Sequence, residues 1–192
     1  MKYYNEYIEK AHCNALEKGF YDDKTIPLED RFFLIQTEIG ECGEAWRSDR
    51  WAQKEDVERY EEHYNDLVEE DGEICYFISY IKSTVQDELA DVMIRLFDIA
   101  GFLGIRIDKE YQISIIPRET FFGNLSNIQR LVFKLLDKIK NNIWNEWAAF
   151  HFFSIFRYIE EFAVMQEIEL YKHIDLKMQH NKTREHKHGK KM

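Results

Sequence analysis

The feature that most constrains the fold of this chain is a long apolar stretch at residues 85–105, VQDELADVMIRLFDIAGFLGI. At the 100° rotation per residue of an α-helix, its apolar side chains fall on almost every side of the axis. A helix that is hydrophobic nearly all round needs burial by other parts of the chain. We therefore expect this segment to be the helix around which a mostly helical protein is organised.

One narrow polar stripe interrupts this apolar surface. Its members are spaced i, i+3, i+7 and i+10 and share one helix face: Glu88, Asp91, Arg95 and Asp98. Burial of a carboxylate is costly unless a positive charge compensates it. Arg95 can neutralise one of the three acids, and we expect it to form a structural pair with Asp98. The stripe therefore predicts a metal ion or a cationic partner helix.

Length and composition favour one domain spanning residues 1–192. The chain is 45% hydrophobic and 15% aromatic with only 2 Pro and 8 Gly, which is typical of packed helices. A net charge of −10 argues against nucleic-acid or membrane-surface binding. No apolar run reaches the roughly 18 residues needed to cross a bilayer, and no secretion signal is recognisable. Three cysteines without metal-ligand spacing are typical of a reducing compartment, so we expect a cytoplasmic protein.

Apolar periodicity predicts further helices on both sides of residues 85–105. We expect them at residues 2–18, about 30–49, within the acidic region 50–73, about 125–141 and about 145–180. The helix within 50–73 should be short, exposed and ended by Asp71-Gly72. Residues 75–82 are ambiguous between a β-segment and an early turn of the 85–105 helix. The stretch after Gly104 is typical of a loop with some extended character.

A second pair of carboxylates lies on the helix predicted at 30–49. Glu38 and Glu41 are three residues apart beside an apolar stripe that needs burial. Two buried helices packed side by side bring four carboxylates together, namely Glu38, Glu41, Glu88 and Asp91. Hard oxygen ligands of this kind suit Mg²⁺, with Mn²⁺ as a substitute. The alternative is an ordinary bundle in which arginines and lysines neutralise these acids.

Two glycines lie inside the same predicted helix. Gly40 and Gly43 should each cost about 1 kcal/mol relative to Ala. We expect close approach of another helix backbone to be the reason that they are present.

A local reversal of charge occurs near the end of this acidic chain. Lysines and arginines gather at residues 172–191, and a helix would place Lys177, Asn181 and Arg184 on one face. A cationic face beside a carboxylate–metal cluster is suited to a polyphosphate substrate. The alternative for the last few residues is a disordered basic tail.

Three blocks of the chain, taken in order, resemble the MazG-like, all-α nucleoside triphosphate pyrophosphohydrolases. They are EIGECGEAWR (38–47), DELADVMIRLFDIAGFLGI (87–105) and KMQHNKTREHKHGKK (177–191). The resemblance implies an all-α helical bundle of the NTP pyrophosphatase type. It also implies Mg²⁺-dependent cleavage of the α–β phosphoanhydride of a (deoxy)nucleoside triphosphate, giving the monophosphate and pyrophosphate. Such an activity would serve nucleotide-pool housekeeping.

The resemblance also implies roles for individual residues. The metal and catalytic groups would be Glu38, Glu41, Glu88 and Asp91, one of which would orient or deprotonate the attacking water. The phosphates would be bound by Lys177, Asn181 and Arg184. A phosphoribosyl-ATP pyrophosphohydrolase-like enzyme is one alternative, since it would share the site and differ in its pocket. A non-catalytic acidic helical interaction protein is another, although it leaves the buried carboxylates unexplained.

The chain departs from the family pattern by two insertions, one acidic at about 50–73 and one helical at about 106–165. The second carries an additional hairpin of large apolar residues, which we expect to pack on the two acidic helices. It would take the place that a partner subunit normally fills. We expect a homodimer through the remaining surface, with a self-contained monomer as the alternative.

Overall fold

The computed structural model describes residues 2–62, 72–141 and 146–189, and every regular element among them is helical. The α-helices are α1 (Lys2–Glu17), α2 (Leu28–Arg47), α3 (Lys54–Glu62), α5 (Gly72–Tyr80), α6 (Val85–Phe102), α7 (Phe121–Lys140), α8 (Glu146–Met165) and α9 (Leu170–Thr183). A short 3-10 helix, η1 (His186–Gly189), follows α9. Within the described part, no helix is both long and apolar enough to cross a membrane. The prediction of an all-α protein is therefore confirmed.

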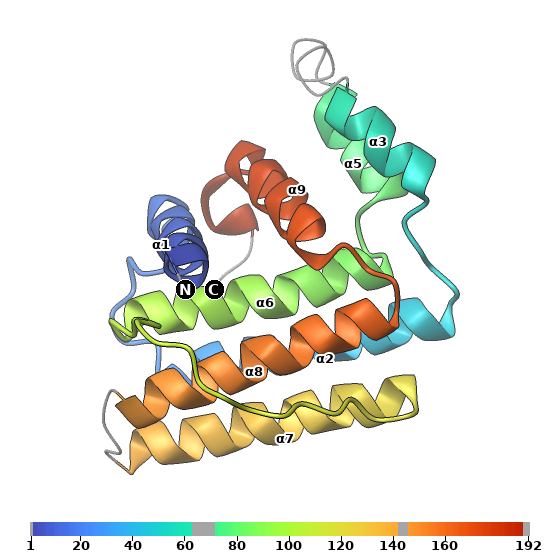
Figure 1. Cartoon of the computed structure of the whole chain (residues 1–192). Coiled ribbons are helices and arrows are strands. Elements are labelled where there is room, and N and C mark those ends of the chain that lie inside the picture. Colours follow the sequence, from blue (N-terminus) through green and yellow to red (C-terminus); the bar gives the residue numbers. More distant parts are fainter. Residues whose placement is uncertain (1, 63–71, 142–145, 190–192) are drawn as a thin grey trace.

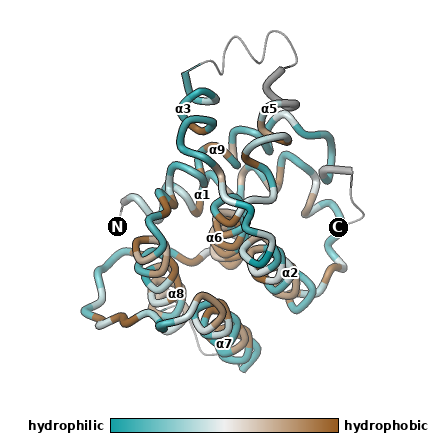
Figure 2. Tube along the Cα trace, turned by 90° about the vertical axis from the view of Figure 1, so that its right-hand side faces the viewer, coloured by the Kyte–Doolittle hydropathy of each residue, from teal (hydrophilic) through white to brown (hydrophobic). Residues whose placement is uncertain are grey.

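Helix α6 lies in the middle of the molecule, as its apolar surface predicts (Figure 1, Figure 2). It packs against α1, α2 and α9, and over a smaller area against α8. Its fully buried side chains point in several directions and include Leu89, Val92, Met93, Leu96 and Phe97. Burial of each large apolar side chain contributes roughly 1.5–3 kcal/mol relative to exposure. The main hydrophobic core is thus built around α6.

Both ends of α6 have recognisable caps. Thr84 is the N-cap, and its Oγ1 accepts a hydrogen bond from the Asp87 N–H at 3.3 Å, which satisfies one of the free N–H groups of the first turn. At the other end Gly104 adopts a φ of 67°, and the Ile105 N–H donates to the Ala100 carbonyl at 2.8 Å. This left-handed termination favours glycine because it has no Cβ.

The apolar hairpin predicted in the helical insertion packs on the two acidic helices. Helix α7 contacts α2, and α8 contacts both α7 and α6. The irregular connection at 103–120 runs along this hairpin (Figure 1). It is fixed at Ile107, whose N–H donates to Asn5 Oδ1 at 2.9 Å. The predicted loop is confirmed, because no helix or strand is assigned between Phe102 and Phe121.

The single helix expected at 145–180 is wrong, because the chain reverses between α8 and α9. Glu167 adopts a φ of 57°, and the Ile168 N–H returns to the Ala163 carbonyl at 2.9 Å. No glycine or proline marks this turn, so periodicity alone does not reveal it. The reversal carries α9 away from α7 and lays it against α6, between α1 and α5.

Residues 75–82 adopt neither of the two expected structures. Most of them belong to α5, a separate helix that packs on α3 and projects with it from the long helices (Figure 1). Fully buried Phe77 packs against Tyr60, with ring centroids 5.6 Å apart. The helix expected within 50–73 is present as α3. Its predicted end at Asp71-Gly72 falls at the edge of the described residues: Asp71 lies outside them, and Gly72 is the first residue of α5.

A close approach of two helices occurs at Gly101 rather than at the predicted glycines. A Cβ added to Gly101 on α6 would lie 2.5 Å from His12 Cβ and 3.2 Å from a backbone carbonyl of α1. A Cβ at Gly40 would meet nothing within 4 Å, and one at Gly43 would meet the Phe122 ring at 3.1 Å. The expectation of a helix backbone at Gly40 and Gly43 is therefore wrong.

This difference predicts opposite effects of the same substitution at two positions. Gly101→Ala should lower the free energy of unfolding by about 1–3 kcal/mol, because α1 must move to admit the methyl group. Gly40→Ala should raise it by up to about 1 kcal/mol, because alanine is the better helix former and nothing obstructs it. Urea denaturation followed by circular dichroism measures both. Similar changes in the two variants would contradict the packing described for α1 and α6.

Candidate metal centre

Helices α2 and α6 pack side by side and bring three of the four predicted carboxylates together. One oxygen from each of Glu38, Glu88 and Asp91 lies within 4.8 Å of the other two. A divalent cation bound to oxygen ligands at about 2.1–2.6 Å can bridge a group of this size. Glu41 lines the same cavity but is exposed and lies outside the group. The four residues thus share one cavity, with Glu41 at its edge.

Glu88 is the least compensated of these acids. It is only 4% exposed, and in the described part of the chain no hydrogen bond or ion pair to its carboxylate is found. Burial, followed by the charges of Asp87 and Asp91, raises its pKa to about 8. A buried carboxylate without a partner is costly, and a cation among the three acids would relieve that cost. The donor set, made of carboxylate oxygens, therefore fits Mg²⁺ or Mn²⁺.

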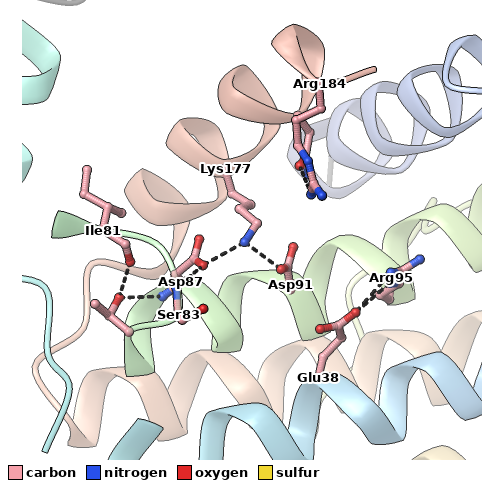
Figure 3. A network of polar contacts seen from close by, with 10 residues as sticks. Glu38, Ile81, Ser83, Asp87, Asp91, Arg95, Lys177 and Arg184 are labelled. Carbon is pink, nitrogen blue, oxygen red and sulfur yellow. Dashed lines mark hydrogen bonds and ion pairs between the residues drawn. The ribbon is translucent and has the colours of Figure 1, made fainter. Parts of the chain in front are cut away.

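The expected pair between Arg95 and Asp98 is wrong. Arg95 reaches across to α2, where its Nη2 and Nε lie 3.0 and 3.1 Å from Glu38 Oε1 (Figure 3). Asp98 instead accepts a hydrogen bond from the Tyr21 hydroxyl at 2.9 Å and lies 2.9 Å from His12 Nδ1. The guanidinium therefore neutralises a carboxylate of the neighbouring helix. The spacing of residues along α6 alone does not reveal this pairing.

Helix α9 is the cationic partner that the stripe on α6 predicts. Lys177 Nζ lies 2.7 Å from Asp87 Oδ2 and 2.7 Å from Asp91 Oδ2 (Figure 3). Burial lowers the pKa of Lys177, but Asp91 and Asp87 outweigh this effect and raise it above its ordinary value. The lysine is therefore charged inside the protein.

Asn181 and Arg184, the other two predicted phosphate-binding residues, line the same cavity. Asn181 is 5% exposed, and Arg184 Nη1 lies 3.5 Å from its Oδ1. The chain beyond α9 is tied down by Lys18, whose Nζ donates to the carbonyls of Lys182 and Arg184. The predicted carboxylates and the predicted phosphate-binding residues thus face one cavity.

Three residues at this site were not predicted from the sequence. Asp87 is 1% exposed and bonded to Lys177, whereas Lys82 and Asn14 line the cavity. The Oδ1 of Asn14 is buried with no hydrogen-bond partner in the described part of the chain. Asp87 alone carried a signal, because Thr84-x-x-Asp87 is typical of a helix start. Neither Lys82 nor Asn14 belongs to a recognisable spacing.

A cation bound between the three acids should stabilise the folded protein. Millimolar Mg²⁺ or Mn²⁺ should raise the melting temperature, because a ligand at a hundred times its dissociation constant contributes roughly 2.7 kcal/mol. Differential scanning calorimetry measures the effect, and EDTA should reverse it. The variant Glu88→Gln should lose most of the increase. A wild-type melting temperature that neither cation changes would contradict the metal-binding interpretation.

Comparison of the chain with protein-family models, curated proteins and solved structures found no match. The features of the described part that indicate a function are therefore those of the cavity: the carboxylates of α2 and α6, the cationic groups opposite them, and the unpaired Oδ1 of Asn14.

Proposed function

We propose that this protein is a Mg²⁺-dependent nucleotide pyrophosphohydrolase, which cleaves the α–β phosphoanhydride of a (deoxy)nucleoside triphosphate. The observation that carries the proposal is the uncompensated carboxylate of Glu88, buried within 4.8 Å of two other acids. Cationic side chains of α9 and of the turn before α6 line the same cavity. Binding of a metal–polyphosphate complex requires carboxylates that bind the metal and cationic side chains that bind the phosphates, and the cavity contains both.

Metal binding and phosphate binding would fall to residues on two sides of the cavity. Glu38, Glu88 and Asp91 would hold the cation, which would polarise the phosphate and lower the pKa of a bound water. Glu41, one helical turn from Glu38 at the edge of the same cavity, would accept the proton of the attacking water.

On the opposite side, Lys177, Asn181 and Arg184 would bind the phosphates and offset the charge that develops on the leaving pyrophosphate. Lys82 adds a further exposed cation to the cavity lining. The resemblance of the three sequence blocks to MazG-like enzymes supports the same assignment of roles.

The hairpin of α7 and α8 covers α2 and α6, which supports its proposed role in place of a partner subunit. A single chain would then hold a complete site. The expected homodimer through the remaining surface stays a prediction.

Replacement of the Glu88 carboxyl group by an amide should lower activity without unfolding the protein. Glu88→Gln should lower kcat/KM for pyrophosphate release by at least about a hundredfold, because an amide is a poor Mg²⁺ ligand. The matched control is Glu44→Gln on the exposed surface of α2, which should retain activity. Release of pyrophosphate from a nucleotide panel that includes phosphoribosyl-ATP measures the effect. Full activity of Glu88→Gln, or release of orthophosphate in place of pyrophosphate, would contradict the proposed reaction.

The unpaired amide of Asn14 should contribute to substrate choice rather than to stability. Asn14→Leu should raise KM for the preferred nucleotide by roughly tenfold, because the ligand loses one hydrogen bond in a buried site. The same change should leave the free energy of unfolding unchanged or higher, since the amide has no partner to lose. Steady-state kinetics and urea denaturation test the two parts. A destabilised variant with unchanged KM values would show that Asn14 serves the fold alone.

A further inference from the structure

The carboxylate of Asp91 would contact two positive charges in the proposed site, the metal ion and the ammonium group of Lys177. It belongs to the group of three acids, and its Oδ2 also lies 2.7 Å from Lys177 Nζ. A divalent cation among these acids would place a second positive charge beside the lysine. Like charges repel strongly in a buried site of low dielectric constant. Lys177 and the metal therefore compete for Asp91.

Asp87 is the second carboxylate that contacts Lys177. Its Oδ2 lies 2.7 Å from Lys177 Nζ and accepts a hydrogen bond from the Ser83 N–H at 2.9 Å (Figure 3). The Thr84 cap also bonds the Asp87 N–H, so the residue is fixed at the start of α6. Asp87 is 1% exposed, does not line the cavity and is not among the three clustered acids. It is a fixed anion behind the lysine rather than a candidate ligand.

We infer that Asp87 is a positioning residue that retains Lys177 at the cavity while a metal ion takes Asp91. In the metal-free protein the lysine is shared between Asp91 and Asp87. When the metal binds, Lys177 leaves Asp91, stays anchored by Asp87, and offers its ammonium group to the phosphates. Metal binding then precedes productive phosphate binding. This inference rests on the proposed function, since it takes Glu38, Glu88 and Asp91 as the metal ligands.

The affinity of the intact protein for Mn²⁺, measured by electron paramagnetic resonance without any nucleotide, tests the inference. Asp87→Asn should weaken Mn²⁺ binding by roughly tenfold, because Lys177 then has only Asp91 as an anionic partner and resists its loss. The double variant Asp87→Asn/Lys177→Met removes the competing cation and should bind Mn²⁺ at least as tightly as the wild type. It also avoids leaving one buried charge unpaired. Asp98→Asn, which removes a carboxylate from the same cavity without touching Lys177, is the charge-matched control and should have a much smaller effect.

Each of the following results would contradict the inference and would indicate a different role for Asp87. Unchanged Mn²⁺ affinity in Asp87→Asn makes the Asp87–Lys177 pair purely structural. A double variant as weak as Asp87→Asn makes Asp87 a metal ligand. An equal loss in Asp98→Asn reduces the effect to total charge. If Asp87→Asn does not fold, the double variant still decides, because weaker binding than in the wild type refutes competition by Lys177. Absence of Mn²⁺ binding in the folded wild type refutes the metal site, and with it the proposed function.

Discussion

The ion pair on which the site most depends is that of Lys177 with Asp87 and Asp91, which joins α9 to α6 inside the protein. Buried charges of this kind add little net stability, because their desolvation offsets most of their attraction, yet removal of one partner typically costs about 3–5 kcal/mol. The pair therefore fixes where α9 lies more than it strengthens the fold. Because α9 also carries Asn181 and Arg184, that placement decides which cationic groups face the acids of α2 and α6.

Charge balance explains why these acids occur on helices that are otherwise apolar. Glu38 has Arg95, Asp91 and Asp87 have Lys177, and Glu88 has no partner within the described residues. The structure thus sets two cations against these four carboxylates and leaves Glu88 without an ion-pair partner among the described residues. A fold selected for stability alone favours an apolar residue at such a position. The deficit is the physical reason to assign a ligand to this cavity.

Close packing of α1 against α6 forms one wall of the cavity. At Gly101 the backbones of α1 and α6 come so close that a methyl group would collide with His12. Two polar contacts then fix the same wall, since Asp98 receives the Tyr21 hydroxyl and lies against His12. Asn14 belongs to this wall, and its side-chain Oδ1 is buried without a hydrogen-bond partner among the described residues.

The sequence by itself determined the all-α class, the burial of α6, and the helix faces on which Glu38, Glu88, Asp91 and the basic segment lie. These follow from helical periodicity and from the cost of burying charge, which act locally along the chain. Only the tertiary structure decided how the charges pair: Arg95 with Glu38 rather than Asp98, and Lys177 with Asp87 as well as Asp91. It also decided the reversal at Glu167 and the close contact at Gly101. Such choices depend on which helix lies opposite each residue, and the spacing within one helix carries no information about its neighbours.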